Sequence, residues 1–304
     1  LIDAISDAMK LAMEKHDNLV LMGQDIADYG GVFKATDGFL AQFGADRVRN
    51  TPLCESAIVG AALGLSINGY KAMMEMQFSD FVTVGFNQIV NNLAKIHYRW
   101  GQNADVVVRM PTGAGVAAGP FHSQSTEGWF FHTPGLKIVY PSTPREAKGL
   151  LLAAFEDPNP VLFFEHKALY RSMSAEIPDD YYIVEIGKAK VVREGTAVSI
   201  ITYAQGVNWA KTVVEELGID AEIIDLRSLK PIDYDTIDAS IKKTSKVIVL
   251  HEDTRFGGIG ADLSAYISEH LFEYLDAPIL RVTSLDTPVP FGSQLEDQFL
   301  PIDR

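Results

Sequence analysis

The chain has 304 residues, of which 47% are hydrophobic and 22% charged, and its formal net charge is −14. This composition excludes a largely disordered chain, and the negative charge argues against nucleic-acid binding, which needs Lys and Arg to replace phosphate counterions. The single cysteine, Cys54, excludes an internal disulfide and favours a reducing compartment. We expect no membrane span, because no apolar run reaches ~18–20 residues. We also expect no targeting peptide, because the chain opens Leu1-Ile-Asp3 without a methionine or a charged n-region, and its ends look trimmed.

In the first half of the chain, predicted strands alternate with predicted helices. Apolar residues at helical spacing predict a helix over residues 2–15, and the apolar run Leu19-Val-Leu-Met22 predicts the first strand. Further elements are expected as strands at 105–109, 136–140 and 160–164 and as helices at 84–98 and 145–155. Strands that alternate with helices indicate βαβ units and a parallel sheet buried on both faces.

The second half repeats this alternation after a linker. The polar stretch Ser172–Asp180, which contains Pro178, is the best linker candidate. Beyond it we expect strands at 197–203, 221–226, 246–251 and 278–283 and helices at 207–217, 234–242 and 261–274. The predicted fold class is therefore α/β, with two parallel-sheet domains.

Glu55 is the first candidate site residue. The segment Thr51-Pro-Leu-Cys-Glu55 leads into a helix that is apolar nearly all round and should be buried. Gly60 and Gly64 in that helix would allow another backbone to approach closely. As a first-turn acid, Glu55 would only interact with the helix dipole. As a partly desolvated carboxyl group with raised proton affinity, it would exchange a proton with a cofactor at neutral pH.

His122 is the second candidate. It follows the glycine-rich run Gly113-Ala-Gly-Val-Ala-Ala-Gly119, which comes after the predicted strand ending near Arg109. A dinucleotide site would need these glycines to open a helix and an acidic residue about twenty residues later, but Pro120 follows at once and the acid is missing. His122 is therefore either a solvated loop histidine or one that a mobile glycine loop carries into a cleft.

Other kinds of site have little support in the sequence. The histidines show no metal-ligand spacing, one cysteine cannot form a structural zinc site, and there is no Gly-x-Ser-x-Gly elbow of a serine hydrolase. Phe78, Phe81 and Phe86 form an aromatic cluster, which is more often part of a core than a platform for a cofactor. The stretch Asp157-Pro-Asn-Pro160 is by default a turn before a strand.

Several motifs in a fixed order resemble a known family over nearly the whole chain. They are Tyr29-Gly-Gly-Val-Phe33, Thr51-Pro-Leu-Cys-Glu55, Phe121-His-Ser-Gln-Ser125, Pro134-Gly-Leu-Lys137, Pro141-Ser-Thr-Pro144, Ala147-Lys-Gly-Leu150 and Leu285-Asp-Thr-Pro288. With them the sequence resembles the beta subunits of thiamine-diphosphate-dependent 2-oxo acid dehydrogenases, most closely the branched-chain (2-oxoisovalerate) enzymes. The resemblance implies a transketolase-like pyrimidine-binding domain over 1–175 and a transketolase-type C-terminal domain over 185–304.

The resemblance also implies an active site shared between subunits. In this family the cofactor lies between an alpha subunit, which holds the diphosphate through Mg²⁺ and a Gly-Asp-Gly motif, and the beta subunit, which holds the aminopyrimidine. This chain contains no Gly-Asp-Gly. We therefore expect it to contribute half of a site in an α2β2 heterotetramer.

Residue roles follow from the same resemblance. Glu55 would bind a pyrimidine ring nitrogen and favour the imino tautomer, which suits a carboxyl group of raised proton affinity. Phe81 would stack on the pyrimidine, and Gln77 is a further expected cofactor-binding residue. His122 would donate a proton to the lipoyl sulfur during reductive acylation, a role that an imidazole of near-neutral pKa suits.

Family members also hold a potassium ion, largely through backbone carbonyls. The matching positions in this chain are Val106, Ala154, Phe155, Asp157 and Asn159. Backbone carbonyl ligands leave no trace in a sequence, so only the side chains of Asp157 and Asn159 can be checked there. Such an ion would have a structural role.

The implied reaction is oxidative decarboxylation of a 2-oxo acid and transfer of the acyl group to lipoyl-lysine of a dihydrolipoyl acyltransferase. The segments Phe163-Phe-Glu-His-Lys167, Leu169-Tyr-Arg171 and Phe78-Ser-Asp-Phe81 resemble the branched-chain enzymes more than pyruvate dehydrogenase. This resemblance favours branched-chain substrates such as 3-methyl-2-oxobutanoate, with pyruvate and then acetoin as alternatives. The acyltransferase would dock through its peripheral-subunit-binding and lipoyl domains, with Glu296 and Asp297 as candidate contacts. Bacterial cytoplasm and mitochondrial matrix both suit the sequence.

Two other interpretations stay open at this stage. A non-catalytic scaffold would have little reason to retain Glu55, Phe81 and His122 together. A self-sufficient transketolase-like enzyme, or a natural alpha–beta fusion, would require a further segment before Leu1.

Overall fold

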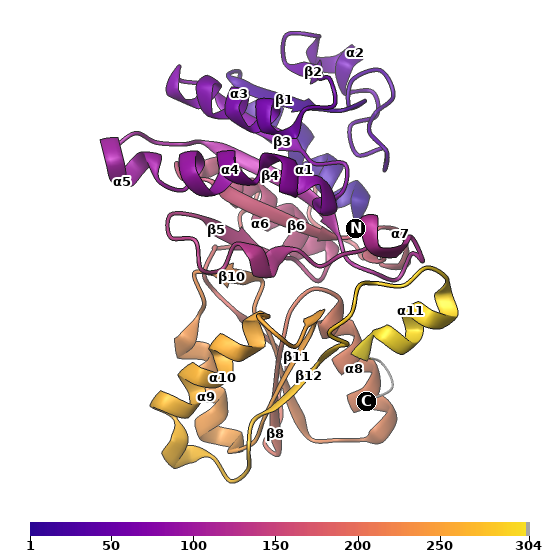
Figure 1. Ribbon diagram of the computed structural model, residues 1–304, viewed down its shortest axis with the longest axis vertical. Helices are drawn as coiled ribbons and strands as arrows, with labels where there is room; N and C mark the ends of the chain where they lie inside the picture. The colour runs from indigo at the N-terminus through magenta and orange to yellow at the C-terminus, as the bar shows by residue number, and fades with distance from the viewer. Residues whose placement is uncertain (302–304) are drawn as a thin grey trace.

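The computed structural model describes residues 1–301, and the prediction of two α/β domains is confirmed (Figure 1). The first half of the chain lies at the top of Figure 1, and the second half, in orange and yellow, lies at the bottom. The segment 173–189 between them contains no helix or strand. Within residues 1–301, no helix is both long enough and apolar enough to cross a bilayer.

The first domain is built on a sheet with the strand order β10-β5-β6-β4-β3-β1-β2. Its strands are β1 (Leu19–Gly23), β2 (Val48–Asn50), β3 (Lys71–Glu75), β4 (Val106–Thr112), β5 (Lys137–Val139), β6 (Val161–His166) and β10 (Ser228–Lys230). All neighbours pair in parallel except β10 and β5, which are antiparallel. The parallel strands β1, β3, β4 and β6 are buried along almost their whole length, because helices cover both faces, whereas β2 at the edge is largely exposed.

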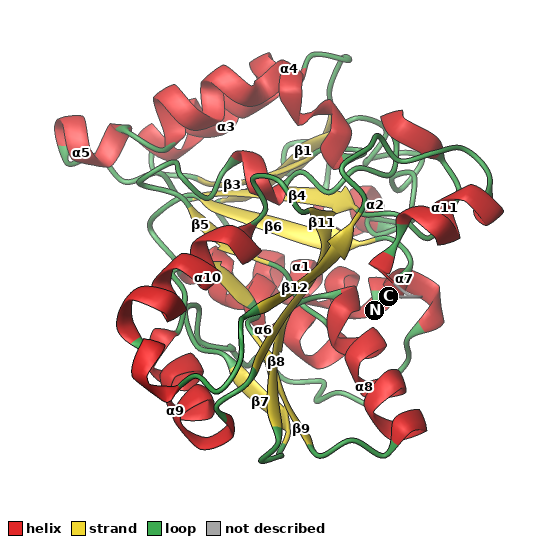
Figure 2. Ribbon diagram, turned by 60° about the horizontal axis from the view of Figure 1, so that its bottom comes forward, coloured by secondary structure: helices red, strands yellow, loops and turns green. Residues whose placement is uncertain are grey.

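Successive residues of these strands enter two different hydrophobic cores. In β3, Met73 packs into the core beneath α1 (Ile2–Lys15) and α6 (Pro144–Glu156), whereas Met74 packs into the core beneath α3 (Glu55–Ile67) and α4 (Val82–Asn87). Figure 2 shows these two helix pairs on opposite faces of the sheet. Side chains that alternate across a strand explain this division between the two cores. The short helices of the domain are α2 (Phe39–Phe43), α5 (Ile96–Trp100) and α7 (Leu169–Ser172).

The second domain repeats the plan on a smaller sheet. Its strand order is β12-β11-β8-β9-β7, with β7 antiparallel at the edge. The strands are β7 (Lys190–Arg193), β8 (Val198–Thr202), β9 (Ala221–Asp225), β11 (Val247–Thr254) and β12 (Leu280–Ser284). The helices are α8 (Gln205–Leu217), α9 (Tyr234–Thr244), α10 (Ile259–His270) and α11 (Ser293–Phe299). In Figure 1, α8 covers one face, and α9 and α10 cover the other.

The two domains share a strand and a core. Strand β10, from the second half of the chain, pairs with β5 and forms the edge of the first sheet. One hydrophobic core runs from Leu162 and Phe164 of β6 to Tyr203 and Leu226 of the second domain. The predicted boundaries, 1–175 and 185–304, stay predictions, and β10 shows that the second half reaches into the first sheet.

The predicted helix over 84–98 is wrong in one respect. The chain forms α4, then a π-helical turn at Gln88–Leu93, then α5 from Ile96. A π turn admits one more residue than an α turn, so the side chains that follow it rotate relative to a regular helix. Apolar spacing cannot reveal such a turn.

His251, in β11, is buried at 1% exposure, and each of its two ring nitrogens makes one hydrogen bond. Its Nδ1 donates to the carbonyl of Asp253 at 3.1 Å, and its Nε2 accepts from the backbone N–H of Gly260 at 3.2 Å. A protonated ring could not accept that second bond. Burial is the main cause that lowers the pKa of His251 to about 4, against an ordinary value of 6.5.

This histidine makes stability depend on acidity. The unfolded chain binds a proton at His251 between pH 6.5 and 4 and the folded chain does not, so stability is present at neutral pH and falls as the pH falls. Lowering the pH from 8 to 5 should therefore reduce the free energy of unfolding by about 2 kcal/mol through His251 alone. Urea denaturation of the purified chain should show a flatter pH dependence for His251→Gln. An exposed control, His270→Gln, should keep the wild-type slope, and an unchanged slope for His251→Gln would contradict this account.

Candidate active site

The candidate residues gather where neighbouring parallel strands end. Gln24 follows β1, Gln77 follows β3, and the loop with His122 follows β4, and these three strands are adjacent in the sheet. Helix α3 also begins at this edge, with Glu55 as its first residue. Open α/β sheets bind ligands outside the carboxyl ends of their strands. The fold thus brings together residues that lie up to about a hundred positions apart, a separation that local sequence patterns do not report.

Glu55 is buried, with 9% of its surface exposed, and one of its carboxyl oxygens accepts a hydrogen bond. Its Oε1 accepts a hydrogen bond of 2.9 Å from Nε2 of Gln24, which is also buried. Among the described residues, Oε1 of Gln24 has no hydrogen-bond partner although it is inaccessible to solvent. Gly85 in α4 packs against the start of α3, where a Cβ would lie 3.5 Å from the Glu55 carbonyl. The result is a desolvated carboxyl group beside an unsatisfied amide oxygen, a pair that a polar ligand would complete.

Helix α3 is less buried than its sequence suggests. One face, with Ile58, Val59 and Ala62, enters the core, but the opposite face is open and Ile67 is 49% exposed. The expectation of a helix buried all round is therefore wrong for this chain alone. An apolar face exposed on the surface is typical of a subunit interface.

Two aromatic rings enclose His122. Phe81 ends a 3₁₀ turn at Ser79–Phe81, and its ring centroid lies 5.5 Å from that of His122, while the Phe78 centroid lies 4.8 Å away. Both contacts are edge-to-face. Phe86 instead packs on Phe130, so the expected cluster of three phenylalanines is divided. Gln77 lies in the bend just before Phe78.

The loop over residues 113–125 is a chain of tight backbone turns. Gly113, Gly115 and Gly119 all adopt positive φ, and a Cβ at Gly113 would lie 2.4 Å from Nε2 of His166. Only glycine fits such a position without strain. At the far end, the backbone N–H of Gln124 donates to Asp80 at 3.1 Å. These glycines lead into a 3₁₀ turn, not an α-helix, so they do not form a dinucleotide-binding helix start.

Lys167 is a neighbour of the site that the sequence did not identify. Its Nζ donates to the carbonyl of Gly113 at 2.7 Å and lies 5.7 Å from the centre of the Phe78 ring. Burial lowers the pKa of Lys167 to about 8, although nearby carboxylates, Asp80 first, act in the opposite direction. The lysine ties the start of the loop to the end of β6.

A buried ion cluster lies in the sheet directly before the site. Arg109 of β4 contacts Glu165 of β6 through two nitrogens, at 2.5 and 2.7 Å, and contacts Glu75 of β3 at 2.6 Å. The hydroxyl of Tyr170 also donates to Glu165, at 2.6 Å. Arg109, Glu75 and Glu165 are each no more than 3% exposed. Glu75 and Arg109 are partners in the strand register, so the sheet itself sets this geometry.

The expected potassium ligands lie around the end of α6. The carbonyls of Ala154 and Phe155 fall in the last turn of that helix, where carbonyl groups lack helical partners. Asp157 Oδ1 accepts from the backbone N–H of Asn159 at 2.9 Å, and Oδ2 forms an ion pair with Lys137. Val106 opens β4, and the next residue, Val107, pairs with Val161 at the start of β6. Free carbonyls and a carboxylate suit a cation, although Lys137 already neutralises Asp157.

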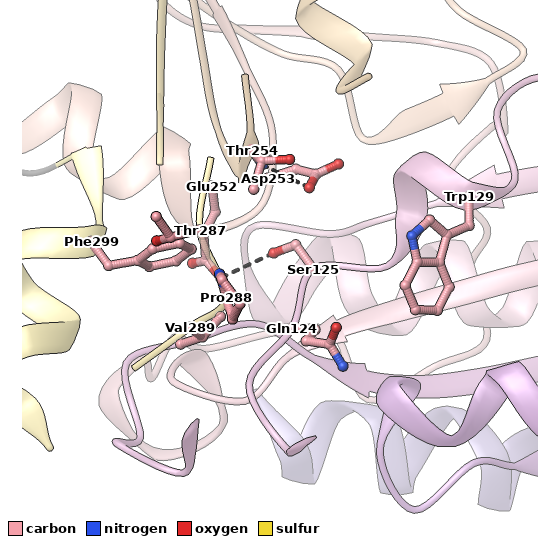
Figure 3. Close-up of a pocket in the computed structure, with 10 residues that line it drawn as sticks. All are labelled: Gln124, Ser125, Trp129, Glu252, Asp253, Thr254, Thr287, Pro288, Val289 and Phe299. Atoms are coloured by element: carbon pink, nitrogen blue, oxygen red, sulfur yellow. Dashed lines mark hydrogen bonds between the residues drawn. The ribbon is translucent and has the colours of Figure 1, made fainter. Parts of the chain in front are cut away.

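A cavity of about 200 Å³ lies between the two domains (Figure 3). Its walls come from the loop, from the 3₁₀ turn at Glu127–Trp129, from the end of β11 and from the C-terminal segment: Gln124, Ser125, Trp129, Glu252, Asp253, Thr254, Thr287, Pro288, Val289 and Phe299. Burial raises the pKa of Asp253 to about 7. The lining includes neither Glu55 nor His122, and the cavity reaches the loop only at Gln124 and Ser125.

One expected surface contact is wrong. Glu296, in α11, is buried at 3% exposure, and its Oε2 accepts from the backbone N–H of Ala117 at 3.0 Å. It therefore cannot serve as an exposed docking residue, whereas Asp297 is exposed. Amphipathic spacing in a seven-residue helix is too short a pattern to distinguish the two positions.

Comparisons with known proteins agree with this architecture. Residues 1–173 match the family described as transketolase, pyrimidine binding domain, and residues 187–304 match transketolase, C-terminal domain. Among solved structures, one described as "Split gene transketolase, inactive beta4 tetramer" has a TM-score of 0.78 and 24% identity, and the match covers 97% of this chain and 91% of that one. At this identity the likeness concerns the fold.

Curated relatives are more similar in sequence. The chain is 47% identical to the 2-oxoisovalerate dehydrogenase subunit beta of Bacillus subtilis, over 98% of this chain and 93% of that protein. It is 46% identical to the mitochondrial subunit of that name from Dictyostelium discoideum, over 95% and 80%. It is 44% identical to the pyruvate dehydrogenase E1 component subunit beta of Bacillus subtilis, over 99% and 94%.

Proposed function

The chain belongs to the beta subunits of the 2-oxo acid dehydrogenases, which depend on thiamine diphosphate, and from this membership we propose its substrate, partners and residue roles. With an alpha subunit, it oxidatively decarboxylates a branched-chain 2-oxo acid such as 3-methyl-2-oxobutanoate. The acyl group passes to lipoyl-lysine of a dihydrolipoyl acyltransferase. The desolvated carboxyl of Glu55, at the sheet edge that holds His122, is the observation that carries this proposal.

Glu55 and Gln24 fit the polar edge of an aminopyrimidine. When bound, thiamine diphosphate supplies the nucleophilic carbon and the electron sink for decarboxylation. Gln24 fixes one oxygen of Glu55, which leaves the second oxygen to hold a proton toward a ring nitrogen. The unpartnered Oε1 of Gln24 would accept from an amino group of the ligand. Phe81 offers a ring for stacking, and Gln77 lies at the same strand end.

His122 is assigned the delivery of a proton to the lipoyl sulfur. Its ring lies against Phe78 and Phe81, on a loop that begins and ends at the sheet edge. Aromatic edges around the imidazole limit its orientation. This arrangement supports a donor that faces an incoming lipoyl arm.

The site is completed by a partner. This chain has no Gly-Asp-Gly sequence, so the diphosphate and Mg²⁺ are assigned to the alpha subunit. The open face of α3 and the exposed rings of Tyr98 and Trp100, at 95% and 66%, support a large interface in an α2β2 assembly. A structural potassium ion is assigned to the carbonyls at the end of α6, with Val106, Ala154, Phe155, Asp157 and Asn159 as its ligands.

The acyl pocket draws on the aromatic residues after β3. Phe163 and Phe164 are fully buried in β6, so they act on the pocket only by supporting the sheet. Phe78 and Phe81, which are half-buried, are the accessible part of the motif that favours branched substrates. The relative named as a pyruvate dehydrogenase component, at 44% identity, makes pyruvate the alternative substrate.

The test is reconstitution of the chain with its alpha subunit and a series of 2-oxo acids. We expect kcat/KM for 3-methyl-2-oxobutanoate to exceed that for pyruvate by about tenfold or more, the range that a few pocket methylenes provide. The isolated chain should bind thiamine diphosphate weakly even with Mg²⁺. A preference for pyruvate or acetoin would overturn the substrate assignment, and tight Mg²⁺-dependent binding by the isolated chain would overturn the shared site.

A further inference from the structure

The His122 loop, residues 113–125, has a backbone that needs external support. Three of its glycines adopt positive φ, and Ala117 does so as well, at 55°. Glycine-rich backbone has many alternative conformations of similar energy. At its base the loop is closed by bonds from the N–H of Gly113 and the hydroxyl of Thr112 to the Gln124 carbonyl, at 3.1 and 3.0 Å. Those two bonds leave the middle of the loop unrestrained.

Glu252, in β11 of the second domain, holds both ends of the loop with one oxygen. Its Oε1 accepts from the backbone N–H of Ala114 at 2.7 Å and from the hydroxyl of Ser125 at 3.2 Å, a bond drawn in Figure 3. Its Oε2 is bonded to Nε2 of His166 at 2.6 Å. Burial acts to raise the pKa of Glu252, but His166 and the Ala114 N–H lower it overall. The side chain is thus a charged acceptor in a buried place.

The C-terminal segment holds the middle of the loop. Oε2 of Glu296 accepts from the N–H of Ala117, and the backbone of Ala118 forms an antiparallel bridge with Phe291. The Phe291 ring lies so close to Gly119 that a Cβ there would be 2.3 Å from it. In Figure 1, α11 lies beside α7, at the junction of the two domains. These contacts come from residues far from the loop in sequence.

We propose that Glu252 and Glu296 are positioning residues that let the second domain set the place of His122. The proposal rests on the proposed function, in which His122 serves lipoyl acylation. Within residues 1–301, the side-chain hydrogen bonds of the two glutamates go to Ala114, Ala117, Ser125 and His166, and none goes to Glu55 or His122. Each glutamate acts by fixing a backbone N–H of the loop, at Ala114 or Ala117, which lie eight and five residues before the histidine. A catalytic group displaced by about 1 Å can lose a hundredfold in rate, so this support would determine how well His122 performs.

The experiment uses the reconstituted enzyme with three variants and a control. Glu252→Ala and Glu296→Ala each remove an anchor, while Glu252→Gln retains an oxygen for Ala114 and Ser125, with His166 free to adopt its other tautomer. Glu215→Ala, on the exposed side of α8, controls for loss of a carboxylate. Hydrogen exchange of the Ala114 and Ala117 amides reports on the loop directly. Lipoyl acylation and decarboxylation with an artificial electron acceptor are measured on the same samples.

Both alanine variants should exchange faster in the loop and lose about tenfold to a hundredfold in lipoyl acylation, with a smaller loss in decarboxylation. Glu252→Gln should recover most of both properties. His122→Ala should show the same split between assays, and the double variant His122→Ala/Glu252→Ala should be no slower than His122→Ala, because both changes remove one function. If Glu252→Ala fails to fold, Glu296→Ala and Glu252→Gln still decide the question.

Three results would overturn the proposal. Unchanged exchange at Ala114 and Ala117 would show that the glutamates do not hold the loop. Losses that multiply in the double variant would show that Glu252 acts independently of His122. Equal losses in both assays would indicate a general structural effect. Normal acylation by His122→Ala, with a loosened loop in the glutamate variants, would instead refute the role given to His122.

Discussion

Replacing Glu55 with Gln should reduce turnover of the assembled enzyme by about 10²–10⁴-fold, the contribution typical of a positioned acid–base group. Gln has nearly the shape of Glu and can still interact with Gln24, so the start of α3 should keep its structure. It cannot gain or lose a proton at neutral pH. The loss should therefore appear in kcat, measured by decarboxylation with an artificial electron acceptor.

Two controls separate this chemical effect from damage to the fold. The variant should assemble with the alpha subunit as the wild type does, by size-exclusion chromatography, and should retain its unfolding midpoint within a few degrees. Gln24→Ala should reduce activity by a smaller factor, because it removes the partner of the carboxyl group but leaves the group itself. If Glu55→Gln retained more than about a tenth of the wild-type turnover, general acid–base catalysis by this residue would be refuted.

The sequence predicts those parts of the site that depend on local pattern. The apolar run after Glu55 predicts both the helix and the buried position of its first carboxyl group. The glycines and Pro120 predict a loop instead of a helix around His122, and the structure has that loop. In these places a few consecutive residues determine the conformation, so reading along the chain is sufficient.

The residues that the sequence did not identify owe their positions to strand register. Gln24 contacts Glu55 only because β1 ends at the sheet edge where α3 begins. Lys167 contacts Gly113 because β4 and β6 are neighbouring strands. No spacing along the chain encodes these pairs. The open face of α3 illustrates a related limit, since apolar composition does not reveal whether a face is covered by the same chain or by another.

Strand β10 shows the same limit at the level of domains. Alternating strands and helices predict two separate sheets, yet residues 228–230 leave the second domain to pair with β5. A three-residue edge strand has too little periodicity to be assigned to one sheet or another. Its position follows from packing between the domains, where Leu229 enters the shared core.

Replacing Arg109 with Met should destabilise the first domain strongly, by about 3–5 kcal/mol of unfolding free energy. Burial raises the pKa of Glu75 even with Arg109 beside it, and one Glu75 oxygen already lacks a partner among residues 1–301. Burial acts to lower the pKa of Arg109, but Glu165 and Glu75 raise it above its ordinary value, so the guanidinium stays charged. Without it, two carboxylates would lie in the core with no counter-charge.

The sign of the pH dependence distinguishes this mechanism from simple loss of packing. In Arg109→Met the buried carboxyls must bind protons to remain folded, while the unfolded chain releases them above its ordinary pKa of 4.5. The folded state therefore holds more protons, and the destabilisation should be smaller near pH 5.5 than at pH 8. A packing defect alone would give the same loss at both values. Urea denaturation at the two pH values provides the measurement.

Matched variants complete this test. Arg49→Met removes an exposed arginine whose ion pair lies on the surface, and it should cost at most about 1 kcal/mol. Arg109→Lys keeps the charge but loses the two parallel bonds to Glu165, so its stability should fall between wild type and Arg109→Met. Adding Glu75→Gln and Glu165→Gln to Arg109→Met should restore part of the loss, because the uncompensated charges are gone. If Arg109→Met were as stable as Arg49→Met at pH 8, the cluster would not stabilise the sheet edge on which Gln77 and Phe81 depend.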